Sequence, residues 1–377
     1  MEHYLDNAAT TMVCPEAARA ALEAMTEYYG NPGSTHTKGR EARKRLDAAR
    51  AQVASAMGCA SGEIVFTSCG SESDNWAILN GAELMKRRGG HIISSKTEHD
   101  AVRKSLDELE KRGFSVTRLS PDENGAVSVD AVRNALREDT ILVSLMMVNN
   151  ETGSVTDISG VAKALHDAGS SALLHTDAVQ AFLKVPFSAS KLGADMISVS
   201  GHKIHAPKGI GALYVKSGVR LKPFVIGGSQ EEGRRAGTEA MPQIVAFGKA
   251  CEIARAGFAE YTEKMASQRD EIIVRVQSGI PGSLVIGGGA PHILNLSVPG
   301  MRSEVIMNFL EARGVYVSKS SACKRGARSH VLEAMGLDSA VIDGAIRIGL
   351  SRYTEEEDID AFCTGLKDAC CTLARKK

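Results

Sequence analysis

A lysine that follows a short apolar run is the residue around which the chemistry of this chain can be organised. Residues 194–199 read as a buried strand that stops at Ser200-Gly201 and presents His202 and Lys203 at its end. Open α/β sheets bind ligands at the carboxyl ends of their strands, and lysine forms Schiff bases with aldehyde cofactors. Lys203 is therefore a candidate anchor for pyridoxal phosphate (PLP). On these residues alone, a solvated surface lysine is the simpler interpretation.

Two further predicted strands end in residues that suit the same cofactor. Gly70 and Ser71 follow a short strand and open a helix, whose free N–H groups and dipole favour an anion such as a phosphate. Asp177 ends another strand, where it can pair with a protonated pyridine nitrogen, and Gln180 could reach the phenolic oxygen of the ring. The structural alternatives are an ordinary strand–turn–helix connection with Ser71 as N-cap, and an aspartate that caps the next turn.

His99 and Asn150 occupy equivalent positions after two more predicted strands. An imidazole can stack on a pyridine ring and move protons, and the Asn150 amide could donate to the cofactor or to a substrate carboxylate. A surface histidine and a polar turn are the corresponding structural interpretations. Because the carboxyl ends of parallel strands meet at one edge of a sheet, we expect all of these side chains to gather there.

The last third of the chain contributes a cysteine in a basic segment and an arginine on a strand. Cys323 is flanked by basic residues at positions 319, 324, 325 and 328. Nearby cations favour the thiolate, which makes Cys323 a candidate nucleophile, whereas an incidental cysteine in a solvated basic loop is the alternative. Arg347 has a planar guanidinium that suits a carboxylate, although a surface salt bridge would use the same geometry.

The elements that must position these residues alternate between strands and helices over the first two thirds of the chain. Strands are expected at 63–67, 91–95, 115–119, 140–148, 172–176, 195–199 and 211–215. Helices are expected at 15–29, 38–57, 72–88, 100–112, 129–137, 158–168, 237–256 and 258–278. The alternation predicts an α/β fold, with a mainly parallel seven-stranded sheet between helices.

The remainder of the chain predicts a smaller α+β domain. It mixes expected strands at 284–286, 293–298, 315–318 and 345–350 with helices at 303–313 and 355–375. We therefore expect a large domain over residues 13–255, and a small domain formed by residues 1–12 and 256–377.

Composition and charge exclude several classes of protein. The chain has 377 residues, of which 43% are hydrophobic, and its 45 basic residues equal its 45 acidic ones, so no global basic field favours nucleic acid. No apolar run approaches the ~20 residues of a membrane span, and the first residues lack a signal-peptide pattern, so we expect a cytoplasmic location and no membrane partner.

The eight cysteines show no zinc-type spacing, so we expect free thiols and no metal site. Six of the other cysteines are expected to be small buried hydrophobes, as a buried cysteine usually is. They are Cys14, Cys59, Cys251, Cys363, Cys370 and Cys371.

Over essentially its whole length, the sequence resembles the PLP-dependent cysteine desulfurases of NifS/IscS type, which have PLP fold type I and belong to the class V aminotransferase superfamily. The resemblance rests on motifs whose order and spacing are specific. They are Tyr4–Thr11, Gly30-Asn31-Pro32, Ser71–Asn75, Thr97-Glu98-His99, Asn149-Asn150-Glu151, Asp177–Gln180, Ser200–Lys203, Arg235–Thr238, Ser321-Ala322-Cys323 and Arg347–Leu350.

This resemblance implies roles for the matching residues. Lys203 would hold PLP covalently and shuttle protons. Asp177 would pair with the pyridine nitrogen, Gln180 with the phenolate, and His99 would stack on the ring. The phosphate would be bound by Gly70, Ser71, Ser200 and His202, with Thr238 reaching over from the second subunit of a homodimer.

The resemblance also implies a substrate and a product. Asn150 would contact the cofactor and, with Arg347, the carboxylate of L-cysteine. Cys323 would take the substrate sulfur as a persulfide, leaving alanine, and would pass it to a sulfur-acceptor protein such as an iron–sulfur scaffold or a thiolation enzyme. The segment after Cys323 departs from the family pattern, because it is shorter and more basic.

Three other functions share parts of this pattern. A selenocysteine lyase has the same scaffold, and another PLP-dependent lyase or aminotransferase would not use Cys323. A non-catalytic sulfur-relay subunit could keep the fold without the chemistry. Lys203 argues against the last of these, because an inactive subunit has no need of a lysine that anchors the cofactor.

Overall fold

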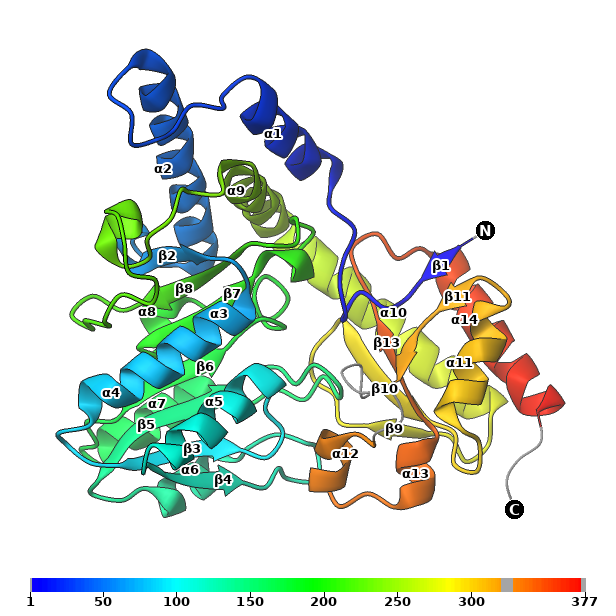
Figure 1. The fold of residues 1–377 in the computed structure, drawn as a ribbon. Helices are drawn as coiled ribbons and strands as arrows, with labels where there is room; N and C mark the ends of the chain where they lie inside the picture. Colours follow the sequence, from blue (N-terminus) through cyan, green and yellow to red (C-terminus); the bar gives the residue numbers. More distant parts are fainter. Residues whose placement is uncertain (1, 320–327, 374–377) are drawn as a thin grey trace.

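The computed structural model describes residues 2–319 and 328–373, whose strands form a large sheet, a smaller sheet and one two-stranded pair (Figure 1). The larger sheet has seven strands in the order β2-β8-β7-β6-β5-β3-β4. Its strands are β2 (Ile64–Thr67), β3 (His91–Ser95), β4 (Ser115–Leu119), β5 (Thr140–Met146), β6 (Leu173–Asp177), β7 (Met196–Ser200) and β8 (Gly211–Val215). All seven predicted strands are present, and the expected α/β fold class is confirmed.

The direction of the strands determines which ends meet. Strand β8 is antiparallel to both of its neighbours, β2 and β7, and every other neighbouring pair in the large sheet is parallel. Strand β2 therefore runs in the same direction as β7. As a result, the carboxyl ends of β2, β7, β6, β5 and β3 lie at one edge of the sheet.

Successive side chains of these strands point to opposite faces of the sheet, and they are apolar on both sides because both faces are covered. Phe66 and Ile197 belong to the core cluster on one face, and Val65 and Met196 belong to the cluster on the other. The first cluster includes residues of α1 (Pro15–Thr26), α2 (Thr37–Met57), α7 (Ile158–Asp167), α8 (Ala189–Leu192) and α9 (Met241–Ala256). The second includes residues of α5 (Asp100–Lys111), which is the next helix along the chain after the short α4 (Gly81–Met85) (Figure 1).

One predicted helix, over 72–88, has three parts in the structure. Helix α3 (Gly70–Asn75) continues into a π-helical stretch (Trp76–Asn80) and then into α4. Trp76 is fully buried in this stretch, and its indole N–H donates to the carbonyl oxygen of Lys222 at 2.9 Å. The helical run therefore begins two residues earlier than predicted, at Gly70.

The smaller sheet has four antiparallel strands in the order β12-β13-β10-β9. They are β9 (Leu284–Ile286), β10 (Ile293–Ser297), β12 (Ser318–Lys319) and β13 (Ala345–Gly349). Helices α10 (Phe258–Gly279), α11 (Ser303–Glu311) and α14 (Glu356–Thr372) pack against it around a separate core cluster. The predicted strand over 315–318 is divided into β12 and β11 (Val315–Tyr316).

Several short elements had no signal long enough to predict. They are β1 (His3–Tyr4), which pairs in parallel with β11, and the helices α8, α12 (His330–Ala334) and α13 (Ser339–Asp343). Helix α6 (Val129–Ala135) is two residues shorter than expected. Elements of two to five residues span at most about one period of a helix or strand pattern, so periodicity cannot identify them.

The separate cores are compatible with a division into domains, but the proposed boundaries, 13–255 against 1–12 with 256–377, stay a prediction. No helix within the described ranges is long and apolar enough to cross a membrane. Three expectations about cysteines need correction: Cys371 is exposed on α14, and Cys59 and Cys370 are only half-buried. Cys14, Cys251 and Cys363 are buried as expected.

Candidate active site

Lys203 lies at the end of β7, in a single 3₁₀ turn formed by Gly201–Lys203. Its Nζ donates to the carbonyl oxygens of Ala8 and Ala9, both at 2.7 Å. The N-terminal segment 6–11 therefore crosses the edge of the large sheet and meets the lysine there. The predicted placement of Lys203 at a strand end is correct.

Asp177 is the last residue of the neighbouring strand β6, and its side chain is buried. Its Oδ1 accepts a hydrogen bond from the N–H of Val179 at 2.9 Å. Burial raises the pKa of the Asp177 carboxyl above its usual value, while the charges of His99 and Lys203 act in the opposite direction. A cationic group placed beside this carboxyl would favour its charged form.

Ser200 and Gly70 form a close-packed corner at the same edge. The Ser200 hydroxyl is buried, and among the residues that the structure describes it has no hydrogen-bond partner. A Cβ added to Gly70 would lie 2.7 Å from Cγ2 of Val179 and 3.5 Å from Cβ of Ser200. The main chain at the start of α3 can approach the Val179 side chain this closely only because residue 70 has no side chain, and Ser200 lies at ordinary contact distance. Ser71, the next residue, is exposed.

His202 and His99 flank the lysine and the aspartate in different ways. His202 Nδ1 lies 3.1 Å from Thr10 Oγ1, and burial, followed by the charge of Lys203, lowers the pKa of His202 to about 4. His202 is therefore neutral at pH 7. His99 is the N-cap of α5, where its Nδ1 accepts from the N–H of Ala101 at 3.1 Å.

Gln180 shares a hydrogen-bond acceptor with the lysine. Its Nε2 donates to the carbonyl oxygen of Ala8 at 2.8 Å, and its Oε1 lies 3.3 Å from Nε2 of His292. The structure thus brings Gln180, Lys203 and the N-terminal segment together at one oxygen atom.

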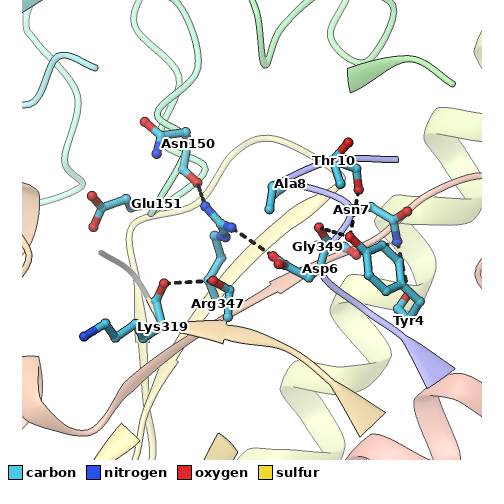
Figure 2. Close-up of polar contacts among 12 residues, drawn as sticks. Tyr4, Asp6, Asn7, Ala8, Thr10, Asn150, Glu151, Lys319, Arg347 and Gly349 are labelled. Carbon is cyan, nitrogen blue, oxygen red and sulfur yellow. Dashed lines mark hydrogen bonds and ion pairs between the residues drawn. The ribbon is translucent and has the colours of Figure 1, made fainter. Parts of the chain in front are cut away.

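Arg347 is buried on β13, and its guanidinium reaches across from the small sheet to the end of β5 (Figure 2). Nη1 donates to the main-chain oxygen of Asn150 at 2.8 Å, and Nη2 to Oδ1 of Asp6 at 2.9 Å. In the described part of the chain, the buried Nε has no hydrogen-bond partner. Arg347 and Asn150 are therefore adjacent. The alternative of a surface salt bridge is not what the structure has, because the Arg347 end of its ion pair with Asp6 is buried and the Asp6 side chain is only partly exposed.

The structure does not bring two predicted residues to the site within the part of the chain that it describes, and for different reasons. Cys323 lies outside the described residues. Thr238 is described and exposed, on the segment between Gly237 and α9, and within the described ranges it makes no hydrogen bond to the residues at the sheet edge. Its expected role requires a second subunit.

Part of the site cannot be predicted from residue types. Asp6, Ala8 and Ala9 contribute through a carboxylate and two carbonyl oxygens, and main-chain acceptors leave no trace in residue type. In the sequence, the run Tyr4–Thr11 is one of the motifs of the resemblance, and no role is expected for its residues. Glu98 and Glu151 were also missed; both are buried carboxyls in motifs that directly follow strands.

The arrangement offers an amine, a buried carboxyl, and the Ser200 hydroxyl beside the main chain of Gly70. These groups suit a ligand with an electrophilic carbon, a cationic nitrogen and an anionic group. Within residues 2–319 and 328–373, no group of three or more histidine, cysteine, aspartate or glutamate side chains is arranged to hold a metal ion.

Comparison with known proteins gives a consistent result. The model of the class-V aminotransferase family matches residues 3–362. A protein named cysteine desulfurase 2 from Trichormus variabilis is 44% identical over 362 residues, which cover 95% of this chain and 90% of the relative. A solved structure of a NifS-like protein has a TM-score of 0.93 at 36% identity, covering 99% of this chain and 100% of that one. The structure of SspA in complex with cysteine has a TM-score of 0.82 at 32% identity, covering 94% and 100% of the two chains.

Proposed function

Because the chain belongs to the class-V aminotransferase family and, within it, to the cysteine desulfurases, we propose that it converts L-cysteine to L-alanine and carries the sulfur as a persulfide on Cys323. One observation carries the proposal. Lys203 and Asp177 end neighbouring strands, and the buried hydroxyl of Ser200, which has no partner among the described residues, lies at the same edge. The complex of the similar protein SspA with cysteine supports the choice of substrate.

The residues at this edge fit PLP. The Ser200 hydroxyl and the N–H groups at Gly70 and Ser71 would hold its phosphate, since a buried hydroxyl without a partner is costly unless a ligand satisfies it. His202, neutral at pH 7, would donate a hydrogen bond to the same group. PLP bound there supplies an electron sink that stabilises negative charge at the α-carbon of an amino acid.

Lys203 is the residue that would hold PLP covalently. Its amine is held by the carbonyl oxygens of Ala8 and Ala9, which fix its direction and leave it able to exchange partners. Lys203 Nζ would also be the base that takes the α-proton of the substrate and later returns a proton. The mobile proton therefore stays within reach of one side chain.

Asp177, Gln180 and His99 would tune the cofactor. The Asp177 carboxylate would stabilise a proton on the pyridine nitrogen, and this pairing would offset the burial that raises the pKa of Asp177. Gln180 Nε2 would exchange the Ala8 oxygen for the phenolic oxygen. His99 has Nδ1 engaged by the N–H of Ala101, so Nε2 is the nitrogen that we assign to the cofactor.

Arg347 and Asn150 would bind the substrate carboxylate. The guanidinium is buried, already faces the end of β5, and has an Nε–H without a partner in the described part of the chain. The Asn150 side chain is half-buried beside it, and we assign its amide to both the cofactor and the carboxylate. A planar guanidinium can bind a carboxylate through two parallel hydrogen bonds.

Sulfur transfer would be the role of Cys323. Its thiolate forms a bond to the sulfur of cysteine as the bond between that sulfur and Cβ breaks. The electron pair of the broken bond goes to the carbon side, which is protonated and leaves as alanine, while Cys323 keeps the sulfur as a persulfide. The atoms balance without an external oxidant or reductant.

A homodimer is part of the proposal. Thr238 is exposed, as a residue that serves the phosphate of a second subunit must be in one isolated chain. Large exposed apolar side chains lie on α1, beside segment 6–11 and before Thr238; they are Met12, Leu22, Met25, Tyr29 and Ile226. Mixing Thr238→Ala subunits with Lys203→Ala subunits tests the sharing, because each mixed dimer should contain one site that lacks both residues and one that has both. Unchanged cofactor affinity in the Thr238→Ala homodimer would argue against a shared site.

A single-turnover experiment tests the function. Purified protein saturated with PLP should form equal amounts of alanine and protein-bound persulfide from L-cysteine in the absence of reductant. Cys323→Ala should bind PLP and form no bound persulfide. Sulfide release at the full wild-type rate by Cys323→Ala would move the sulfur acceptor to another residue. The same assay with L-selenocysteine compares the desulfurase with a selenocysteine lyase.

The acceptor protein and the location in the cell stay predictions. An iron–sulfur scaffold and a thiolation enzyme are the acceptors that the family suggests, and the cytoplasm is the location expected from the sequence.

A further inference from the structure

The turn that follows β5 connects the two sheets at the candidate site. Asn149 Nδ2 donates to the carbonyl oxygen of Thr97 at 3.0 Å, which links the turn to the end of β3. From the small sheet, Arg347 donates to Asn150 O, and Asn295 Nδ2 donates to Glu151 O at 3.0 Å. Figure 2 shows Asn150 and Glu151 side by side above Arg347. The main chain of this turn is therefore held from both sides.

The Glu151 side chain extends the connection to α12. It is 4% exposed, and its Oε2 accepts a hydrogen bond from the Ser329 hydroxyl. Ser329 is also the N-cap of α12, because its Oγ accepts from the N–H of Leu332 at 3.1 Å. In addition, His330 Nε2 lies 3.1 Å from the carbonyl oxygen of Glu98. The start of α12 is thus held by polar contacts to the turns that follow β5 and β3.

The position of α12 in the sequence gives this contact a consequence. Ser329 lies six residues after Cys323, and α12 is the first helix after that cysteine in the described part of the chain. The other end of the segment is β12, which pairs with β13 at Arg347. We propose that Glu151, acting through Ser329, is a positioning residue for sulfur transfer to Cys323. This inference rests on the proposed function.

The charge of Glu151 should modulate the contact. Burial raises the pKa of Glu151 to about 7, and the charged groups that face it are Arg347 from β13 and Arg103 and Asp100 from α5. Strand β10 and the N-cap of α12 add the neutral Asn295 and Ser329, and the first residue of α12, His330, is a titratable group beside Ser329 whose pKa is lowered by burial. A hydroxyl donates a stronger hydrogen bond to a carboxylate than to a carboxylic acid. The hydrogen bond from Ser329 to Glu151, which holds the start of α12, should therefore become stronger as the pH rises through 7.

The test compares Glu151→Gln, Glu151→Ala, Ser329→Ala and the double alanine variant. The matched control is Ser128→Ala, which removes the serine N-cap of α6, where Ser128 Oγ accepts from the N–H of Ala131 at 3.2 Å. Both serine variants lose a helix cap, but only Ser329 contacts Glu151. Measurements on holoenzyme are PLP affinity, KM for L-cysteine and the single-turnover rate of Cys323 persulfide formation from pH 5.5 to 8.5.

We expect Glu151→Ala and Ser329→Ala to slow persulfide formation about tenfold, with PLP affinity and KM within about twofold of wild type. The double variant should be no slower than either single one, because both remove the same contact. Glu151→Gln should keep most of the rate and lose the rise near pH 7, since its amide oxygen still accepts from Ser329. Ser128→Ala should match wild type.

Three results would overturn the inference: a Glu151→Gln profile that still rises near pH 7, additive effects in the double variant, or equal losses in Ser128→Ala. Amide hydrogen exchange of residues 330–334 gives a readout that needs no turnover. After correction for the intrinsic effect of pH on amide exchange, the exchange rate of these residues in wild-type protein should fall between pH 6 and 8. The rate should be higher in Glu151→Ala. If wild-type protein forms no alanine from L-cysteine, the proposed function fails, and unchanged exchange in Glu151→Ala separately overturns the Glu151–Ser329 link.

Discussion

Lys203 and Gln180 donate hydrogen bonds to the same atom, the carbonyl oxygen of Ala8, at 2.7 and 2.8 Å. Both side chains belong to the end of the large sheet, and the oxygen belongs to the first few residues of the chain. The N-terminal segment thus orients both the residue that we propose would hold the cofactor covalently and the residue that we assign to its phenolic oxygen. Anything that displaces this segment should affect cofactor binding before it affects the sheet itself.

The first prediction concerns the covalent anchor. Borohydride reduction of PLP-saturated protein should attach the cofactor permanently to wild-type protein and not to Lys203→Ala. Peptide mass mapping should find the label on residue 203. Lys208→Ala is the matched control, because Lys208 is exposed and its Nζ lies 3.4 Å from the carbonyl oxygen of Thr11 on the same segment. Loss of the label in Lys208→Ala, with retention in Lys203→Ala, would reverse the assignment.

The second prediction concerns the packing of the N-terminal segment against β13. A Cβ added to Gly349 would lie 2.4 Å from the main-chain nitrogen of Ala8 and 2.9 Å from that of Asn7. Because these are main-chain atoms, Gly349→Ala must push the segment away, at a cost of about 1–3 kcal/mol. We expect a lower Tm and weaker PLP binding. Gly279→Ala, where the added Cβ has no neighbour within 4 Å, should change neither, and equal behaviour of the two variants would contradict the role of the segment.

The third prediction concerns recognition of the carboxylate. Arg347→Lys keeps the charge and loses the planar pair of donors, so KM for L-cysteine should rise about 10- to 100-fold, equivalent to about 1.5–3 kcal/mol. The absorbance spectrum of the bound cofactor should be unchanged. Arg313→Lys, at an exposed position over the ring of Phe309, is the control for the substitution itself. An unaltered KM in Arg347→Lys would assign the substrate carboxylate to another residue.

The fourth prediction concerns stability and pH. Glu98 is buried, and its Oε1 accepts from Ser95 Oγ at 2.6 Å and from the N–H of Met146 at 3.1 Å. Burial is the largest cause that raises the pKa of Glu98 to about 8. The folded protein therefore keeps a proton that the unfolded chain releases near pH 4. A stabilising contribution present at low pH is lost as the pH rises toward 8, by about 3 kcal/mol between pH 6 and 9.

Glu98→Gln removes this titration and keeps a side chain of similar shape. Its Tm should fall less than that of wild type between pH 6 and 9, with a difference of about 3–4 °C for a protein of this size. Glu123→Gln, at an exposed position, is the control and should follow wild type. Parallel Tm curves for wild type and Glu98→Gln would show that the Glu98 carboxyl does not titrate in this range.

The strands and most long helices could be predicted because their apolar residues recur with a clear period. Ile64–Thr67 and Thr140–Met146 are buried throughout, so the apolar runs mark them directly. The same reasoning placed Lys203, Asp177, Asn150 and His99 at one edge, since parallel strands fix which ends meet. It also predicts Gly70 at a helix start, where the structure shows close packing against Val179.

Contacts made through the main chain, or between residues far apart in sequence, could not be predicted in this way. The oxygens of Ala8 and Ala9 meet Lys203 only after β1 has joined β11 and residue 6 has paired with residue 349. The burial of Glu151 depends on α12, whose five residues are too short to show a period. In both cases the tertiary fold, and not the local pattern, determines the chemistry of the group.

The pairing of the N-terminal segment with β13 has a consequence for synthesis on the ribosome. Asp6 and Arg347 are 341 residues apart, and Asn7 donates to the oxygen of Gly349 across 342 residues. Segment 6–11 cannot make these contacts until β13 has been synthesised, because β13 provides the partner atoms. Long-range pairing of this kind is slow. Capture of the cofactor by nascent protein should therefore come after the synthesis of β13, even though the strand that bears Lys203 is complete much earlier.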